Sequence, residues 1–314
     1  MPDPLTIPRI SQAFVLGAGL GTRLKALTRA RPKPLIPVVG KPLITYAFDH
    51  LLQAGVERFV VNTHHCAGVY ARTFPGNVYR GAPLTFRHEP ELLETGGGIK
   101  NVEDLLGDAP FLVYNGDILA TLPLAPALER HFAAGNEVTL ILRSHGGPLQ
   151  IALDAASERV VDIGNRLGRA PGTHLFTGIY VVSPAFFQRL RREKRSVVPT
   201  FLEMIAQEAA LGAVVIDEGE WWDLGTREQY LAVHQQLRAS APADCWVDPS
   251  ARVDPSARLT GATYVGAGAQ VGAGALLHDS ILWDGTVIAP QAHLSRCIVT
   301  APQSVHGHHA DADF

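Results

Sequence analysis

Apolar and amphipathic stretches alternate along the first 240 residues of the chain. Four short apolar runs predict buried strands, and they cover Phe14–Leu16, Phe59–Val61, Phe111–Tyr114 and Val138–Leu142. Between these runs we expect helices over Pro42–Ala54, Gly98–Leu106 and Leu124–Ala134. Strands that alternate with helices favour an α/β fold with a mostly parallel sheet and helices on both faces. Ligands bind such sheets at the carboxyl ends of the strands, which points to the loops after Leu16 and Tyr114.

A second pattern begins after Pro242, where an aliphatic residue recurs every six positions. The six aliphatic positions are Val247, Val253, Leu259, Val265, Val271 and Leu277. A small residue mostly follows four positions later, and Gly and Pro fill much of the remaining space. This period is typical of a left-handed parallel β-helix, in which each aliphatic side chain points into a triangular interior. We expect about three coils, with the repeat losing its phase after Leu282.

The change of pattern predicts two domains, which fits 314 residues at roughly 150 residues a domain. The α/β domain is expected over residues 11–240 and the β-helix over 245–300, followed by a disordered tail over 301–314. A short β-helix leaves its last coil and its flat faces exposed, so it is expected to join copies into a homo-oligomer. On this view the β-helix assembles the protein, and a chain cut after Arg238 keeps its chemistry. The apolar run Ile281–Trp283 is expected in an interface or against the first domain.

Composition narrows the function classes further. Lys and Arg total 27 against 30 Asp and Glu, so the net charge of −3 predicts no general attraction to nucleic acid. No apolar run reaches the roughly 18 residues that span a membrane, and the Pro-rich first residues lack the apolar segment of a signal peptide. Cys66, Cys245 and Cys297 lie far apart, which predicts neither a disulfide framework nor a zinc site. A reduced, cytoplasmic protein is expected, with no nucleic acid or membrane as partner.

A glycine-rich loop follows the first predicted strand. It contains Gly17, Gly19, Gly21 and Thr22. Glycines at this place let backbone N–H groups approach phosphate oxygens closely. Arg23 adds a planar, permanently charged group, and Pro32 and Pro34 hold Lys33 in an extended segment from which its ammonium can reach the same phosphates. The segment therefore predicts a polyphosphate site.

Two aspartates and a second glycine run add candidate chemistry. Asp117 directly follows the strand Phe111–Tyr114 and Gly116, where a carboxylate can hold a hard divalent cation or simply form a tight turn. Asp223 precedes Gly225-Thr226 and is either a second such carboxylate or a turn residue beside a helix cap. The stretch 89–98 ends in three glycines that open a helix, where a flat base can lie against the backbone.

GAGLGTRL followed by RPKPLIPVVGKPLI resembles the signature of the sugar-1-phosphate nucleotidylyltransferases, and the likeness extends from about Ala13 to Leu237. The resemblance implies a Rossmann-like domain that binds a nucleoside triphosphate and a sugar 1-phosphate. It makes Arg23 and Lys33 the catalytic residues on the phosphates, and Asp117 and Asp223 the ligands of Mg²⁺.

The resemblance also implies the remaining binding residues. The nucleotide is assigned to Gly17, Gly19, Gly21, Thr22, Glu89, Thr95 and Gly96, and the sugar to Gly178 and Asn165. Glu89 stands where relatives have a base-reading amide, and its carboxylate slightly favours guanine. ETGGG followed by NGD is instead similar to N-acetylmuramic acid α-1-phosphate uridylyltransferases, so guanine and uracil both stay open. The usual sugar-side Lys is replaced by the stretch Val161–Arg166, which leaves the sugar open as well.

The stretch HDSILWDGTVIAPQAHLSRCIV resembles the C-terminal part of mannose-1-phosphate guanylyltransferases. The implied reaction joins an NTP and a sugar 1-phosphate into an NDP-sugar with release of pyrophosphate, and it is of either the GTP/mannose type or the UTP/N-acetylmuramate type. Within the enzyme class, transfer of a cytidylyl or uridylyl group to another phosphorylated acceptor is a close alternative. Two functions of other classes also compete with it. An acyltransferase is one, because hexapeptide β-helices often have that activity. A non-catalytic regulatory homologue that binds sugar nucleotides is the other, although such a protein is expected to lose the Arg, Lys or Asp positions that this chain retains.

Overall fold

The computed structural model describes residues 9–19, 21–154, 156, 158–240, 246–300 and 303–314. The chain divides into two compact units. Unit 1 comprises Met1–Leu20 and Ile44–Trp221, and unit 2 comprises Gly21–Leu43 and Trp222–Phe314. Residues 21–43 therefore belong to the same unit as the C-terminal part of the chain. This segment contains the end of the glycine loop, Arg23 and Lys33. A domain boundary near residue 240 does not predict this assignment.

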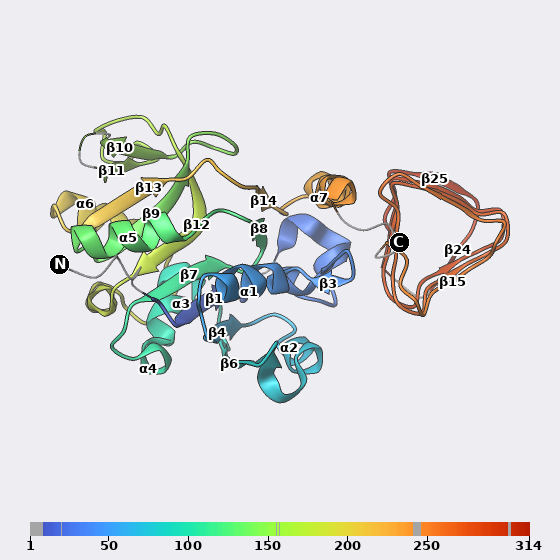
Figure 1. Ribbon diagram of the computed structural model, residues 1–314, viewed down its shortest axis with the longest axis horizontal. Helices are drawn as coiled ribbons and strands as arrows, with labels where there is room; N and C mark the ends of the chain where they lie inside the picture. Colours follow the sequence, from blue (N-terminus) through green and yellow to red (C-terminus); the bar gives the residue numbers. More distant parts are fainter. Residues whose placement is uncertain (1–8, 20, 155, 157, 241–245, 301–302) are drawn as a thin grey trace, which may run out of the picture. The chain divides into compact units, whose positions relative to one another are not determined.

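Unit 1 is built on a ten-stranded sheet of order β10-β11-β13-β9-β12-β7-β1-β4-β6-β5 (Figure 1). Its strands are β1 (Gln12–Leu16), β4 (Arg58–Thr63), β5 (Val78–Tyr79), β6 (Ala82–His88), β7 (Phe111–Asn115), β9 (Val138–Arg143), β10 (Ile151–Asp154), β11 (Arg159–Ile163), β12 (Leu175–Val182) and β13 (Leu211–Val215). The pairings make β5, β11 and β12 run opposite to the other strands. The predicted α/β class with a mostly parallel sheet is confirmed.

Helices complete unit 1. They are α1 (Ile44–Gln53), α2 (Gly68–Thr73), α3 (Glu94–Asn101), α4 (Glu103–Leu106), α5 (Ala125–Ala134) and α6 (Val198–Ala206), with short 3-10 turns at Pro75–Asn77 and Pro184–Arg189 and the small strand β8 (Ile118–Ala120). Ile99 of α3 and Phe201 of α6 share one apolar cluster with Phe14 and Val113 of the sheet. Burial of this cluster stabilises the sheet, in which β1 and β7 are neighbours and end at the same edge.

Unit 2 joins the segment after the glycine loop to α7 (Arg227–Ser240) and to the β-helix. The segment consists of the 3-10 turns η1 (Thr22–Thr28) and η2 (Lys33–Leu35) and a small hairpin of β2 (Pro37–Val38) and β3 (Lys41–Pro42). The strand β14 (Trp221–Asp223) leads into α7. No described helix of the chain has the length and apolarity that a membrane crossing requires.

The β-helix stacks its strands on three faces, seen as a triangular coil in Figure 1. One face holds β15 (Arg252–Val253), β18 (Gln270–Val271), β21 (Val287–Ile288) and β24 (Ser304–Val305). The second holds β16 (Arg258–Thr260), β19 (Leu276–His278), β22 (His293–Ser295) and β25 (His308–Ala310). The third holds β17 (Tyr264–Val265), β20 (Ile281–Leu282) and β23 (Ile298–Val299). The predicted aliphatic residues Val265, Val271 and Leu277 lie in its interior cluster.

Two details of the β-helix differ from the sequence expectation. Leu277 stacks 18 residues after Leu259, but Leu282 stacks 17 residues after Val265, so the repeat loses one residue between Leu277 and Leu282. The phase is therefore lost before Leu282, at a shortened corner. The predicted disordered tail over 301–314 is wrong for its described residues, because β24 and β25 pair with β21 and β22. These strands continue the coil because Val305 supplies another interior side chain.

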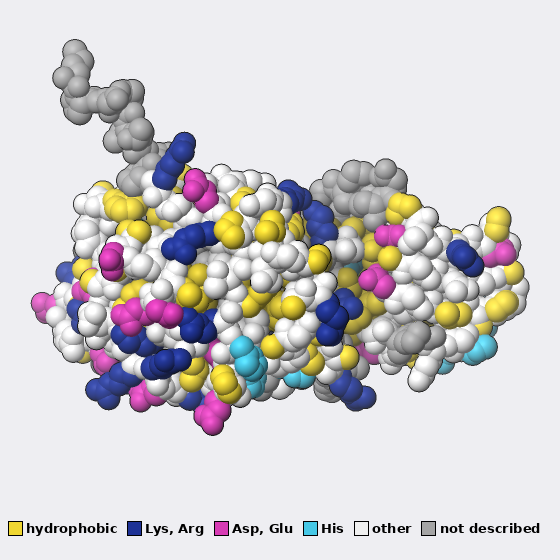
Figure 2. Space-filling view, turned by 90° about the horizontal axis from the view of Figure 1, so that it is seen from below, with side chains coloured by type: hydrophobic (Ala, Val, Ile, Leu, Met, Phe, Trp, Pro, Cys, Tyr) yellow, Lys and Arg dark blue, Asp and Glu magenta, His cyan; other side chains and the backbone are white. Residues whose placement is uncertain are grey.

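The surface of the described residues carries mixed charge. On the face shown in Figure 2, basic and acidic side chains lie interspersed, and neither sign forms a continuous patch there. This distribution agrees with the small net charge of −3. A face of mixed charge does not attract polyanions from a distance.

Two buried histidines make the fold sensitive to acid. His234 in α7 is fully buried, its Nδ1–H donates to the carbonyl of Tyr230 at 2.8 Å, and its Nε2 accepts the N–H of Val39 at 3.3 Å. Burial lowers the pKa of His234 to about 4. Burial likewise lowers the pKa of His131, in α5 of unit 1, to about 4. Both rings are therefore neutral at pH 7, and the ring of His234 needs an unprotonated Nε2.

We expect the free energy of unfolding to fall as the pH drops from 6.5 towards 4. In that window the unfolded chain binds protons on these histidines and the folded chain does not, so acid favours unfolding. For His234 alone the loss is on the order of 3 kcal/mol below pH 4. Urea unfolding between pH 7 and pH 4 measures it, with His234→Gln as the comparison. An equally steep fall in that variant contradicts the assignment to His234.

Candidate active site

The glycine loop begins at the end of β1, where Gly17 is held by two side chains of unit 1. Its N–H donates to Asn62 Oδ1 at 2.8 Å, and its carbonyl accepts the hydroxyl of Tyr70 at 2.8 Å. A Cβ on Gly17 would lie only 2.7 Å from the carbonyl oxygen of Asn62, so no larger residue fits. Gly19 by contrast is exposed, and a Cβ there would meet no atom within 4 Å. The loop is thus fixed at its base and open where phosphate oxygens are expected.

Asp117 lies beside this loop, at the same edge of the sheet. β1 and β7 are neighbours with Leu16 opposite Asn115, and the N–H of Gly116 donates to the carbonyl of Leu16 at 3.0 Å. Burial, with a smaller effect of the Asp117 carboxylate, raises the pKa of the Tyr70 hydroxyl that holds Gly17. The carboxylate is therefore close enough to the base of the loop to act on it electrostatically, as the two adjacent strand ends predict.

Unit 2 brings Lys33, Arg23 and Asp223 together. The ammonium of Lys33 lies 3.0 Å from Asp223 Oδ1, and Arg23 Nη2 lies 3.6 Å from Asp223 Oδ2. The side chain of Lys33 is only 4% exposed, whereas those of Asp223 and Arg23 are 30% and 66% exposed. One carboxylate thus orients two cations, and the guanidinium of Arg23 faces solvent. Such a cluster can neutralise a polyphosphate without leaving a buried charge unpaired.

Two glycines make this cluster possible. Gly21 has φ +60°, and a Cβ there would lie 2.8 Å from Lys33 Cβ. A Cβ on Gly225 would lie 2.6 Å from Arg23 Nη2. Thr22, the fourth predicted loop residue, is exposed at the start of η1. The sequence analysis missed the role of Gly225, although its place just after Asp223 is the available signal.

Asp223 does not cap α7. The N–H of Thr226 donates to Gln229 Oε1 at 2.9 Å, and the N–H of Gln229 donates to Thr226 Oγ1 at 3.2 Å. This is a reciprocal capping box, as the sequence predicts. Because Thr226 performs the capping, the carboxylate of Asp223 serves the two cations instead.

The predicted base-reading residues contact their own chain. Glu89 is fully buried, and its two oxygens accept Asn62 Nδ2 at 2.8 Å and the N–H of Leu93 at 3.0 Å. Thr95 Oγ1 accepts the N–H of Val197 at 2.9 Å. Since Asn62 also binds Gly17, the Glu89 carboxylate joins the base of the phosphate loop to the stretch before α3. Contact of Glu89 with a base stays a prediction.

The three glycines of α3 pack closely, Gly96 and Gly97 against backbone and Gly98 against side chains. The N–H of Gly96 donates to the carbonyl of Arg195 at 2.9 Å, and a Cβ on Gly97 would lie 2.0 Å from the carbonyl oxygen of Glu193. A Cβ on Gly98 would lie 3.0 Å from Asn62 Nδ2. Close packing within the chain explains these glycines, and binding of Gly96 to a nucleotide stays a prediction.

The predicted sugar residues lie in two different settings. Gly178 of β12 has φ +78°, and a Cβ there would lie 2.4 Å from Asn115 Nδ2, so this glycine lets the side chain of Asn115 lie against the strand. Asn165 is exposed in the turn after β11. The sequence analysis missed Asp162, which accepts the N–H groups of the turn at Leu167 and Arg169. Burial acts to raise the pKa of Asp162, but these backbone donors outweigh it and lower the pKa.

The candidate ligands for a divalent cation are carboxylates. In the described part of the chain no three His, Cys, Asp or Glu side chains gather into a site of their own. Mg²⁺ in nucleotide enzymes is commonly bound by one or two carboxylates together with substrate phosphates. Asp117 of unit 1 and Asp223 of unit 2 each offer a carboxylate of this kind, and their joint binding of a cation stays a prediction.

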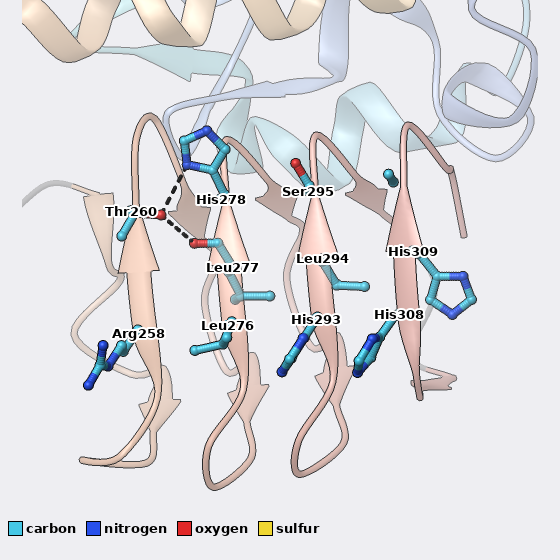
Figure 3. A pocket seen from close by; sticks show the side chains of 11 residues that line it. Arg258, Thr260, Leu276, Leu277, His278, His293, Leu294, Ser295, His308 and His309 are labelled. Atoms are coloured by element: carbon cyan, nitrogen blue, oxygen red, sulfur yellow. Dashed lines mark hydrogen bonds between the residues drawn. The ribbon is translucent and has the colours of Figure 1, made fainter.

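The β-helix has a hollow on its second face, lined by Arg258, Leu276, His293 and His308 among others (Figure 3). The rings of His293 and His308 stack with their centroids 4.0 Å apart. Successive strands on this face are spaced by 18, 17 and 15 residues, so its described coils contain no inserted loop. A catalytic loop of the kind expected for an acyltransferase is therefore not found on this face.

Comparison with known proteins agrees with the geometry. A family model described as nucleotidyl transferase matches residues 12–240. The mannose-1-phosphate guanylyltransferase of Mycobacterium tuberculosis is 30% identical over 236 residues, which cover 74% of this chain and 66% of that protein. The chain thus spans just under two thirds of this relative's length.

Two solved structures share the fold. The UDP-glucose pyrophosphorylase of Acinetobacter baumannii has a TM-score of 0.63 at 19% identity, covering 74% of this chain and 95% of that chain. HddC of Yersinia pseudotuberculosis, complexed with GMP-PN, has a TM-score of 0.60 at 22% identity, covering 73% of this chain and all of that chain. Because the family model spans most of the chain, the protein belongs to the nucleotidyl transferase family.

Proposed function

We propose that the protein is a nucleotidylyltransferase that forms an NDP-sugar and pyrophosphate from an NTP and a sugar 1-phosphate. The observation that supports this most is the cluster of Lys33 and Arg23 on Asp223. A regulatory homologue has no need for a buried lysine held beside an exposed arginine. Family membership gives the reaction class, and the relatives are named as enzymes of that class.

In the proposed reaction, an oxygen of the sugar phosphate attacks the α-phosphorus of the NTP. The new P–O bond forms as the bond to the β-phosphate breaks, and the electron pair leaves with pyrophosphate. The nucleophile is already ionised at neutral pH, so the protein acts by positioning and charge neutralisation. Lys33 and Arg23 neutralise the leaving pyrophosphate, and Gly17 and Gly19 present the loop to the triphosphate.

A divalent cation, which we propose is Mg²⁺, would be held by Asp117 and Asp223 and would neutralise charge on the phosphates. Before substrate binds, Lys33 is the partner of Asp223. We infer that the ammonium stays close to this carboxylate during the reaction, because so buried a charge needs its partner. Thr22, Thr95 and Gly96 complete the proposed nucleotide site, and Gly178 and Asn165 the proposed sugar site.

For the substrates, we propose GTP with a mannose-type sugar 1-phosphate as the first pair. The name of the Mycobacterium tuberculosis relative supports this choice. The ETGGG stretch of α3 supports a second pair, UTP with N-acetylmuramic acid α-1-phosphate. A pyrophosphate-release screen of the four common NTPs against a panel of sugar 1-phosphates separates the two. No release with any pair contradicts the enzyme function.

We place the protein in the cytoplasm as a homo-oligomer that assembles through its β-helix. Support comes from the exposed outer faces of the β-helix, where Leu276 is 39% exposed. Light scattering of the purified full chain tests the assembly. A monomer at micromolar concentration contradicts it.

We expect Arg23→Ala to lower kcat by about 100-fold, the usual loss when one cation of a phosphate site is removed. The variant is expected to fold normally, because the Arg23 side chain is 66% exposed. Steady-state pyrophosphate release measures turnover, and thermal unfolding checks the fold. Arg29→Ala, an exposed residue of the same segment, serves as the control with unchanged kcat. Unchanged turnover in Arg23→Ala removes this residue from the proposed mechanism.

A further inference from the structure

The segment that contains Lys33 is fastened to α7 at its far end. The hydroxyl of Tyr230 donates to the carbonyl of Pro37 at 2.5 Å, and His234 Nε2 accepts the N–H of Val39 at 3.3 Å. Tyr230 and His234 are both fully buried. The hairpin of β2 and β3, which directly follows the η2 turn of Lys33, is thus held by two buried side chains.

Trp283 of the β-helix extends this chain of hydrogen bonds. It directly follows β20, and its Nε1–H donates to the hydroxyl of Tyr230 at 3.0 Å. Tyr230 then donates onward to Pro37. Successive hydrogen bonds in a buried setting polarise and strengthen one another. The indole of a β-helix coil therefore acts, through one tyrosine, on the backbone of the Lys33 segment.

The β-helix also contacts this segment directly. The guanidinium of Arg31 lies 5.3 Å from the ring centroid of Trp283, a cation–π contact two residues before Lys33. After Lys33, Gly40 packs against Tyr264, since a Cβ on Gly40 would lie 2.5 Å from the Tyr264 hydroxyl oxygen. The segment is therefore contacted on both sides of Lys33.

We propose that Trp283 is a positioning residue for Lys33, and that the β-helix takes part in this way in the reaction. The inference rests on the proposed function, in which Lys33 neutralises the leaving pyrophosphate. The ammonium is almost fully buried and lies 3.0 Å from Asp223, so its place depends on the backbone that carries it. A misplacement of about 1 Å in such a site costs on the order of 100-fold in rate.

The β-helix then has a role beyond the one expected from the sequence. Of the apolar run Ile281–Trp283, Trp283 contacts Arg31 and Tyr230, which fall within the first predicted domain. Leu282 instead lies in the interior of the β-helix. The target of Trp283, however, is the segment with the proposed catalytic lysine. The β-helix is then more than an assembly module.

The test uses full-length variants. Trp283→Leu removes the N–H donor and the ring over Arg31, and Trp283→Phe removes only the donor. Gln270→Ala, at an exposed position of β18 in the β-helix with no proposed role, is the control. For each variant, kcat and KM for the NTP are measured well below the unfolding temperature, together with hydrogen exchange of the amides of residues 31–43.

We expect Trp283→Leu to lower kcat by 10- to 100-fold with KM changed less than about threefold, and Trp283→Phe to lie between it and the unaltered protein. Exchange of the 31–43 amides is expected to rise in Trp283→Leu and not in Gln270→Ala. A lower unfolding temperature with unchanged kcat and unchanged exchange overturns the proposal, because it describes a merely structural residue. The exchange result is independent of turnover, so a protein inactive with every pair contradicts only the proposed function.

Discussion

Asp223→Asn is expected to lower kcat by on the order of 1000-fold and to destabilise the fold at the same time. The amide keeps the shape of the side chain but removes the charge that orients Lys33 and Arg23. Loss of a charged group that acts on the transition state typically costs 100- to 1000-fold, and here a proposed metal ligand is lost as well. Because the Lys33 side chain is only 4% exposed, its ammonium is left in a buried place without this carboxylate, at a cost of about 3 kcal/mol.

The two effects can be separated within the chain. A second variant that adds Lys33→Met to Asp223→Asn removes the buried charge, so it is expected to regain most of the stability and none of the turnover. Asp117→Asn is expected to lower kcat and to raise the Mg²⁺ concentration needed for half-maximal rate. Pyrophosphate release at varied Mg²⁺ and urea unfolding measure both quantities. If Asp223→Asn unfolds at the same urea concentration as the unaltered protein, the ion pair with Lys33 is not a buried one.

The fold could be predicted largely because its patterns are local. Each β-helix coil needs interior aliphatic residues, so a six-residue period is visible in the sequence alone. The shortened corner between Leu277 and Leu282 was not predictable in the same way. An unbroken six-residue period from Leu277 leads to Trp283, which is apolar like Leu282, and the sequence alone does not show that Leu282 takes the interior place. The strands within residues 301–314 were missed because they contain polar residues such as His308. Their strand conformation depends on pairing with the preceding coil and not on the local sequence.

The relative placement of two candidate residues could be predicted, because one rule of sheet geometry applies to them. Gly17 and Asp117 follow strands that prove to be neighbours, so they meet at one edge. The burial of Glu89 could not be foreseen, because it depends on Asn62, which comes 27 residues earlier and accepts from Gly17 as well. The residues around Glu89 in the sequence do not show whether its carboxylate accepts hydrogen bonds from its own chain or from a bound base.

The assignment of residues 21–43 to unit 2 could not be predicted either, because it depends on contacts between residues that are far apart in the sequence. Trp283 and Tyr230 are 53 residues apart, and Tyr230 and Pro37 are 193 apart. Such contacts are selected by tertiary packing, and no periodicity in the sequence records them. The role of the β-helix was therefore the least predictable feature, although it alters what a truncation should do.

A chain that ends after Arg238 is expected to lose both turnover and stability. Tyr230, fully buried in the whole chain, loses its partner Trp283, and exposure of such a side chain costs about 2 kcal/mol. α7 also loses the ion pair of Arg227 with Asp313 at 2.7 Å and the hydrogen bond of Gln235 to Asp279 at 3.0 Å. The unfolding temperature is expected to fall by about 5–10 °C for a total of a few kcal/mol.

A chain that ends after Thr300 is the informative control for this truncation. It removes β24 and β25 together with Asp313, but it retains Trp283 and Tyr264 against the Lys33 segment. We therefore expect it to keep kcat within about threefold of the whole chain, whereas the chain cut after Arg238 falls by 100-fold or more because Lys33 is no longer held in place. Pyrophosphate release per folded molecule, at a temperature where circular dichroism shows both chains folded, makes the comparison. Equal kcat in the two truncated chains is the result that confines the β-helix to assembly, as its repeat pattern alone suggests.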